Sequence, residues 1–196
     1  LRGKLERAEK EGRLPKIVMP VHFAGQPCDM LAIHMLSQQY GFKIIEDASH
    51  AIGGKYHDKS IGSCEFSDVT VFSFHPVKIV TSGEGGVALT NCPKIDVKLK
   101  LLRSHGITRD VGLMEYPSDD GWYYEQIDLG YNYRMSNICA GIGRRQMLVL
   151  DKHVAKRRNN FEFYKKALAH ISEISFLEEP KEAFSNRWLS CIMVDP

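Results

Sequence analysis

Apolar and polar positions alternate along the chain with two periods, one typical of helices and one of buried strands. Strand-like and helix-like runs follow one another up to about residue 106, which predicts an α/β fold with a mostly parallel sheet. An irregular aromatic stretch then precedes a long helical segment. In chain order we expect a helix from residue 1, a strand at 16–21, a helix at 28–40, strands at 42–48, 68–74 and 86–90, a helix at 94–106 with Gly106 as its C-cap, the aromatic stretch at 107–136, a helix from 137 to about 169, and a strand-like run at 187–194.

Composition and charge exclude several classes of protein. The chain has 196 residues, 43% of them hydrophobic, which is enough to bury one sizeable core. Its 26 basic and 24 acidic residues give a formal charge of +2, so nothing favours nucleic acid or an anionic membrane as a partner. The five scattered cysteines argue against a disulfide framework and against a zinc site, and we expect no metal. No apolar run suits a signal peptide or spans a bilayer, so we expect a cytoplasmic protein.

One lysine stands out in the segment FSFHPVKIVTSGEGG, residues 72–86. Lys78 follows an apolar strand and precedes a glycine-rich loop, and a lysine shielded from water loses its proton readily and can form a Schiff base. The alternative is a solvated lysine beside a tight turn. Asp47, in IIEDASHAIGG, ends another predicted strand, where parallel sheets bind their ligands. It could simply cap the next segment, but an aspartate upstream of a Schiff-base lysine is also what a pyridoxal phosphate ring requires.

Four segments together resemble the sugar aminotransferases of the DegT/DnrJ/EryC1/StrS family, and the resemblance covers nearly the whole chain. The segments are LPKIVMPVHFAGQPCDM, EDASHAIGGKYHDKSIGSCEFSDVTVFSFHPVKIVTSGEGGVALTN, LLRSHGITRD and WYYEQIDLGYNYRMSNICAGIGRRQM. The resemblance implies the aspartate aminotransferase-like fold (type I) of pyridoxal phosphate enzymes, with a mixed, mostly parallel sheet flanked by helices. Residues 1–150 would form part of the cofactor-binding large domain, and residues 151–196 a connecting helix and the start of the small C-terminal domain. Both ends look truncated, so this chain alone could be an inactive fragment.

The same resemblance assigns residues to the cofactor pyridoxal 5'-phosphate. Lys78 would hold it as a Schiff base and move the proton between substrate and cofactor, Asp47 would pair with the pyridine nitrogen, and His50 would reach the phenolic oxygen. Ser73 would bind the phosphate, and Asn132 would bind it from the partner subunit of a homodimer. From the residues alone, His50 could instead be a satisfied polar group at a helix start. Ser73 would ordinarily fill space in a strand, and the role given to it rests on the resemblance.

For the substrate the resemblance places Arg134 close to the sugar nucleotide and makes His105 a weaker candidate. The segment GYNYRM that carries Arg134 could also be an aromatic loop packed on the core. His22 and Gln26, in a short loop after the first strand, are expected to be structural or at most to support the site residues.

The implied reaction is a transamination in which L-glutamate gives its nitrogen to the 4-keto group of a UDP-linked 6-deoxy-N-acetyl hexosamine, as in surface glycans of the pseudaminic acid type. One alternative is a different sugar nucleotide, such as GDP-4-keto-6-deoxymannose. Dehydratases of the family carry histidine in place of the lysine, so Lys78 argues against that activity. Another alternative is a non-catalytic binding or regulatory protein, which would be expected to lose Lys78 or Asp47.

Overall fold

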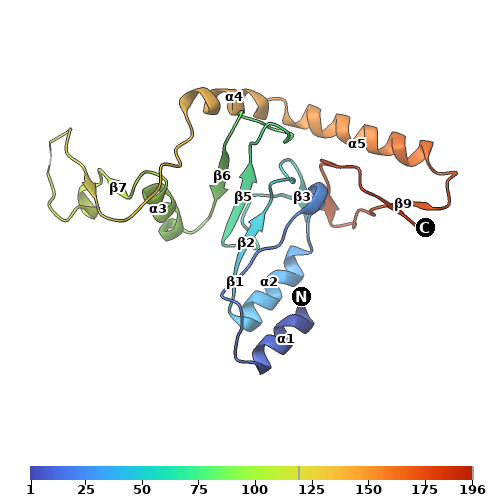
Figure 1. Ribbon diagram of the computed structural model, residues 1–196, viewed down its shortest axis with the longest axis horizontal. Coiled ribbons are helices and arrows are strands. Elements are labelled where there is room, and N and C mark those ends of the chain that lie inside the picture. Colours follow the sequence, from blue (N-terminus) through green and yellow to red (C-terminus); the bar gives the residue numbers. More distant parts are fainter. Residues whose placement is uncertain (119, 196) are drawn as a thin grey trace.

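A four-stranded sheet forms the centre of the molecule, which is described here by a computed structural model over residues 1–118 and 120–195 (Figure 1). The strands lie in the order β1-β2-β5-β6. Strand β2 is parallel to both of its neighbours, β1 and β5, and β6 is antiparallel to β5. The expected α/β fold with a mixed, mostly parallel sheet is therefore confirmed. The strands are β1 Ile17–Val18, β2 Lys43–Asp47, β5 Val69–Ser73 and β6 Gly86–Leu89.

Helices α1 (Arg2–Lys10) and α2 (Met30–Tyr40) lie beside the lower end of the sheet as drawn in Figure 1. Helix α2 begins where the Asp29 side chain accepts a hydrogen bond from the Ala32 amide at 3.1 Å, and it ends at Gly41, whose φ of 77° suits a glycine. Both helices follow the expected pattern.

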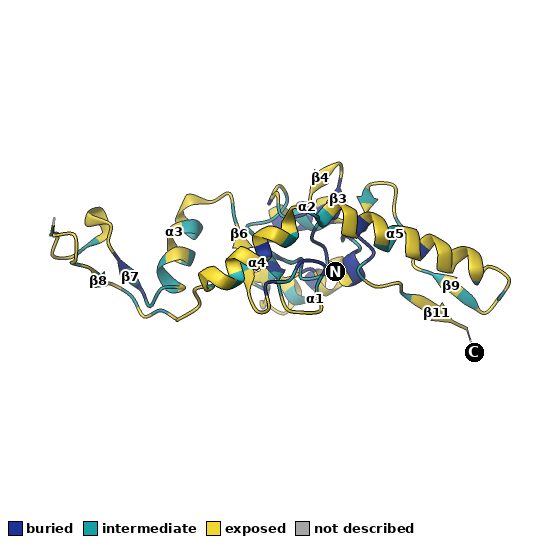
Figure 2. Cartoon of the chain, turned by 90° about the horizontal axis from the view of Figure 1, so that it is seen from above, coloured by how far each residue is buried: buried dark blue, intermediate teal, exposed yellow. Residues whose placement is uncertain are grey.

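The core gathers side chains from α1, α2 and the sheet, and its buried residues lie near the middle of the chain in Figure 2. Burial alternates along β2 and β5, as the two-residue period of a strand requires. Because of this period, Glu46 and Thr70 are buried beside apolar side chains. The core residues are Leu5, Met30, Leu36, Phe42, Ile44, Ala48, Ala51, Ile52, Tyr56, Ile61, Phe72, Ile79 and Val80.

The long helical segment expected after residue 136 is two helices, α4 (Asn137–Met147) and α5 (Leu150–Ala167). Val149, with φ of −120° and ψ of 11°, leaves the helical conformation, so the prediction of one continuous helix is wrong at this point. After the break, Leu150 and Val154 pack against Gly53, so closely that a Cβ added at Gly53 would lie 2.9 Å from Val154 and 3.3 Å from Leu150. Packing against the core therefore outweighs the local helical pattern.

Helix α3 (Pro93–Leu102) leads into an arm that projects from the body of the molecule (Figure 1). The arm contains β7 (Ile107–Thr108), the short 3₁₀ helix η2 (Val111–Leu113) and β8 (Glu125–Gln126). Gly106 does not cap α3 as expected, because the helix already ends at Leu102. A Cβ at Gly106 would lie 1.8 Å from the Asp128 carbonyl oxygen, so this glycine serves the close approach of two backbone segments.

The C-terminal part of the chain returns to the body. Strand β10 (Ala183–Phe184) pairs antiparallel with β3 (Lys55–Tyr56), which also pairs with β4 (Lys59–Ser60). Of the strand-like run 187–194, only β11 (Ile192–Val194) is a strand, paired with β9 (Ile174–Phe176). Residues 185–187, between β10 and β11, are buried against the body. None of the helices in the described part of the chain is long and apolar enough to cross a membrane.

Candidate functional site

The candidate site lies where β2 and β5 end. Asp47 is the last residue of β2 and Ser73 the last of β5, and the two strands are parallel neighbours. Asp47 is fixed by its backbone, since its amide donates to the Pro20 carbonyl at 2.9 Å and its carbonyl accepts from the His22 amide at 3.0 Å. The sheet thus brings together two of the residues that the sequence singled out.

Lys78 lies half-buried in the loop between β5 and β6, with its Nζ 4.5 Å from the centre of the Trp188 ring. The Lys78 amide donates to the His75 carbonyl at 3.0 Å, which closes a turn just before the lysine. Burial lowers the pKa of the Lys78 ammonium below its ordinary value, while the nearby Asp47 carboxylate acts in the opposite direction. The structure therefore favours a lysine that gives up its proton more easily than an exposed one.

His50 stacks on the same tryptophan, with 3.9 Å between the ring centres of His50 and Trp188 and 24° between their planes. Burial lowers the pKa of His50, and the positive charge of Lys78 lowers it further. The His50 Nδ1 atom is buried and has no hydrogen-bond partner within the described ranges. A buried ring nitrogen of this kind is suited to a hydrogen bond with a ligand.

The Asp47 carboxylate is held in its ionised form. Burial would raise its pKa, but hydrogen bonds from Ser49, including the Ser49 amide at 3.0 Å, and the positive charges of His50 and Lys78 bring the pKa below its ordinary value. An ionised carboxylate beside a lysine and a histidine can accept a hydrogen bond from a protonated ring nitrogen. These groups fit pyridoxal phosphate, because a carboxylate, an unpartnered imidazole nitrogen and a half-buried amine occur together.

The other expected site residues are placed differently. Ser73 is half-buried, and its Oγ accepts from the His75 amide at 3.3 Å. Asn132 and Arg134 are exposed on the segment between β8 and α4, where Asn132 pairs with Ser104. His105 follows α3 in a left-handed conformation, with φ of 63°. Among the described residues no hydrogen bond or aromatic contact joins these last three to Lys78 or His50, so their assignment stays a prediction.

A buried polar network lies beneath the carboxyl end of β2. The fully buried His22 ring donates from Nε2 to Glu46 Oε2 at 2.7 Å, and its Nδ1 accepts from the Cys28 amide at 3.1 Å. Ser67 and Thr70 also donate to Glu46. This arrangement fits the structural role expected for His22. Gln26, the other residue of that expectation, has a buried Oε1 without a partner among the described residues.

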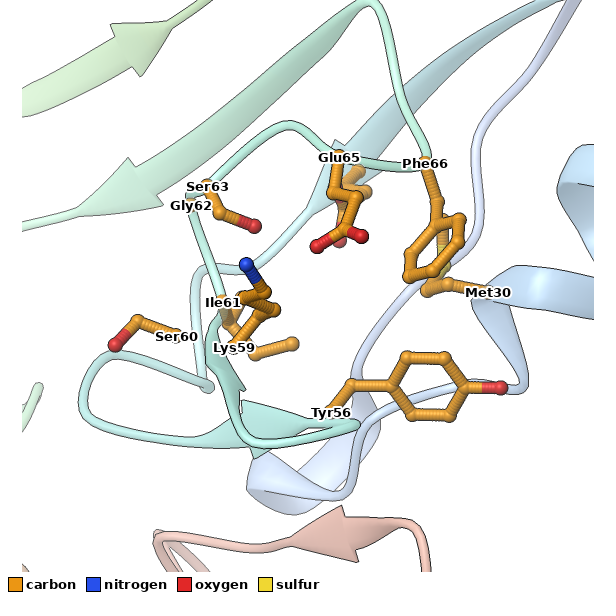
Figure 3. A pocket seen from close by; sticks show the side chains of 10 residues that line it. Met30, Tyr56, Lys59, Ser60, Ile61, Gly62, Ser63, Glu65 and Phe66 are labelled. Carbon is orange, nitrogen blue, oxygen red and sulfur yellow. The ribbon is translucent and has the colours of Figure 1, made fainter.

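Figure 3 shows a small cavity lined by Tyr56, Lys59 and Phe66 among others, and Glu46 also contributes to its lining. Its volume of about 10 Å³ is enough for about one water molecule. Neither Lys78 nor Asp47 lines this cavity, so it is distinct from the candidate site.

Comparison with known proteins identifies the family. The sequence profile of the DegT/DnrJ/EryC1/StrS aminotransferase family matches residues 4–196. The chain belongs to this family. Aminotransferases of the family are enzymes that use pyridoxal phosphate, in agreement with the groups described above.

Two curated relatives are similar over nearly all of the chain. EpsN of Bacillus subtilis (strain 168) is 36% identical over 195 residues, covering 100% of this chain and 47% of its own length. The UDP-4-amino-4,6-dideoxy-N-acetyl-beta-L-altrosamine transaminase of Campylobacter jejuni (serotype O:23/36, strain 81-176) is 34% identical over 200 residues, covering 99% of this chain and 50% of its own length. The chain thus spans about half the length of these two relatives.

Solved structures agree with the fold. PseC of Helicobacter pylori, an aminotransferase involved in the biosynthesis of pseudoaminic acid, is 26% identical with a TM-score of 0.81, over 90% of this chain and 45% of that one. The pyridoxal phosphate form of Spr1654 of Streptococcus pneumoniae, described as a putative sugar aminotransferase, is 26% identical with a TM-score of 0.77, over 92% of this chain and 48% of that one. The type I fold expected from the sequence is therefore confirmed.

Sequence reasoning missed one residue of this site, Trp188. In the sequence Trp188 is simply an aromatic residue in the strand-like run 187–194. Nothing in that run indicates that this part of the chain packs against Lys78. The contact arises because Trp188 packs against His50 and Lys78 across more than a hundred residues of sequence.

Proposed function

We propose that the protein to which this chain belongs transfers an amino group to a nucleotide-linked 4-keto-6-deoxy sugar. The acceptor is a UDP-4-keto-6-deoxy-N-acetyl hexosamine, the donor is L-glutamate, and the product serves a surface glycan of the pseudaminic acid type. The observation that carries the proposal is the grouping of Lys78 with Asp47 and His50 at the strand ends. The name of the C. jejuni relative and the description of PseC support the choice of sugar.

The residues of the chain suit the two halves of such a reaction. When bound, pyridoxal phosphate supplies an electron-poor ring that accepts the electron pair released at the substrate carbon. The Asp47 carboxylate would keep a proton on the ring nitrogen, and His50 Nδ1 would hold the phenolic oxygen. Lys78 Nζ, with its lowered pKa, would take a proton from the substrate carbon and return it. Ser73 would bind the phosphate.

Substrate binding and assembly complete the proposal. We place Arg134 and His105 near the sugar nucleotide, and Asn132 at the phosphate of the partner subunit in a homodimer with shared active sites. The exposure of Asn132 and Arg134 within one chain is compatible with such a role. Residues 1–150 would belong to the large domain, with residues 151–196 connecting it to the small one. The five cysteines are unpaired, which supports a cytoplasmic location.

Borohydride trapping tests the cofactor assignment. The full natural protein is incubated with pyridoxal phosphate, reduced, digested and examined by peptide mass spectrometry. We expect the added mass on Lys78, its loss in Lys78→Ala, and no change in Lys16→Arg, an exposed lysine that serves as the matched control. Absence of label on wild-type Lys78 would refute the assignment and favour a non-catalytic protein of the same fold.

The sugar is tested separately by offering 4-keto UDP and GDP sugars with L-glutamate. We expect 2-oxoglutarate to form with the UDP-linked N-acetyl hexosamine. Turnover with GDP-4-keto-6-deoxymannose alone would replace the proposed sugar, and would leave the reaction class intact.

A further inference from the structure

The turn formed by residues 185–188 is deeply buried, although it precedes the exposed strand β11. Ser185 and Asn186 are 1% and 0% exposed, and Arg187 is 8% exposed. The Asn186 side chain donates to the carbonyls of His50 and Ile52 at 2.7 and 2.8 Å, and accepts from the Trp188 amide at 3.0 Å. One buried amide thus ties the turn to the segment that carries His50.

A second group of residues holds the turn from the other side. Arg158 of α5 donates to both Glu179 oxygens at 2.8 and 3.1 Å and to the Ser185 carbonyl at 2.6 Å. Glu179 also accepts from the Ser185 amide, and the Arg187 guanidinium lies 3.6 Å from Glu179 and 3.9 Å from the centre of the Phe161 ring. Bidentate pairing of this kind is geometrically specific. We call Arg158, Glu179 and Arg187 the clamp.

The backbone of the turn is strained. Arg187 has a φ of 52°, in the left-handed region that residues with a side chain rarely adopt. Strained residues persist where the surroundings determine them, and such places are often functional. The clamp and Asn186 together supply those surroundings.

The strained turn presents Trp188 to the site. The indole stacks on His50, and its Nε1 donates to the Val77 carbonyl at 3.2 Å, the residue directly before Lys78. The Lys78 amine lies 4.5 Å above the centre of the same ring. One side chain from the C-terminal part of the chain therefore contacts both the histidine and the lysine loop.

We propose that Trp188 is a positioning residue of the cofactor site, held by the clamp, which orients the His50 ring and the Lys78 amine for their reaction with pyridoxal phosphate. This inference rests on the proposed function for its cofactor. The stack fixes the plane of the imidazole while its Nδ1 stays free, and the bond to Val77 fixes the backbone before the lysine. The indole also covers the amine on one side.

The test compares Trp188→Ala with Trp188→Phe in the full natural protein, and Trp122→Phe, at the exposed tryptophan of the arm, is the matched control. The first readout is the rate at which diethyl pyrocarbonate modifies His50 without cofactor, measured by peptide mass spectrometry. The second is the rate and pH profile of Lys78 labelling by pyridoxal phosphate and borohydride.

We expect Trp188→Ala to expose His50 and to slow Lys78 labelling about tenfold, with the pH profile moved upward because shielding of the amine is lost. Trp188→Phe keeps an aromatic ring over His50 and should restore most of both properties. Arg158→Lys, which touches neither group, should act in the same direction as Trp188→Ala, because lysine cannot make the bidentate contact.

Unchanged His50 reactivity and unchanged Lys78 labelling in Trp188→Ala would overturn the proposal while leaving the proposed function intact. Wild-type protein that takes no label would refute the proposed function, and the His50 readout would still decide the position of Trp188. A wild-type response in Arg158→Lys would remove the clamp from the proposal.

Discussion

Replacing Glu46 by alanine should strongly destabilise the protein, because three donors lose one acceptor. His22 Nε2 and Thr70 Oγ1 donate to Glu46 at 2.7 and 2.9 Å, and Ser67 donates as well. The hydroxyls have a second partner within reach, since Thr70 Oγ1 lies 3.3 Å from Cys64 Sγ and 3.4 Å from Ser67 Oγ. Among the described residues His22 has none for Nε2, so the loss of this hydrogen bond to a charged group, added to the losses at the two hydroxyls, should cost about 3–5 kcal/mol.

Glu46→Gln separates charge from hydrogen bonding. His22 Nδ1 accepts from the Cys28 amide, which keeps the ring proton on Nε2, and a glutamine oxygen can accept that proton's hydrogen bond. The hydroxyls can accept from the new amide. We therefore expect a smaller loss, of about 1–2 kcal/mol, because a hydrogen bond to a charged group is replaced by a neutral one.

Urea unfolding at neutral pH measures both losses. With a slope of about 2 kcal/mol/M, a loss of 4 kcal/mol moves the midpoint by about 2 M. The exposed neighbour Glu65 provides the control, since Glu65→Ala should stay within about 0.5 kcal/mol of wild type. An unfolding free energy for Glu46→Ala within about 1 kcal/mol of wild type would refute the network.

The pH dependence has a definite sign. Burial would raise the pKa of Glu46, but hydrogen bonds from His22, Ser67 and Thr70 bring it below its ordinary 4.5. The stabilisation is thus complete above pH 4.5 and is lost as the pH falls through the lower pKa of the folded state. The stability difference between wild type and Glu46→Gln should therefore narrow as the pH falls below 4.5. A difference that widens on acidification would contradict the reasoning.

Two further substitutions and one labelling experiment give separate tests. Gly25→Ala should lower the free energy of unfolding by about 2–4 kcal/mol, because Gly25 has a φ of 87° and the new Cβ would lie 1.8 Å from Asn186 Oδ1. The control Gly3→Ala, in open space on a helix, should be neutral or stabilising. Equal effects of the two substitutions on thermal unfolding would argue against the tight contact at Gly25. Asp29→Ala should lose about 1 kcal/mol by urea unfolding because a helix cap is removed, and Asp29→Asn should recover most of it. Lys78 should react with pyridoxal phosphate at lower pH than exposed lysines because burial lowers its pKa, which competitive labelling followed by mass spectrometry measures; simultaneous labelling of all lysines would count against this.

The sheet was predictable because its strands carry their signal locally. The run FKIIEDA is short, centred on two isoleucines and followed by acids, and β2 forms within it with Ile44 buried and Asp47 at its end. The placement of Asp47 at a ligand-binding edge followed from a general property of parallel sheets. Its pairing with Lys78 followed from what a pyridoxal phosphate ring requires. The resemblance to the family added the expected role of His50.

The remaining features depend on contacts that no local pattern contains. The helical pattern of the sequence continues through Val149, yet the helix is interrupted there and Leu150 packs over Gly53. Glycine is the residue type that commonly caps a helix, but Gly106 is required because the Asp128 backbone packs so close that a Cβ would not fit. Trp188 reaches the lysine only after the whole intervening chain has folded.

The bond from Asn186 to the His50 carbonyl joins residues 136 positions apart. Contacts of such long sequence separation require loop closure and form slowly compared with local helices and hairpins. During synthesis, the strand that ends in Asp47 and the loop that carries Lys78 leave the ribosome long before the turn that covers His50. The growing chain therefore passes through a stage in which its reactive lysine has emerged and its shielding indole has not, and efficient cofactor capture should begin only after residue 188 has been released.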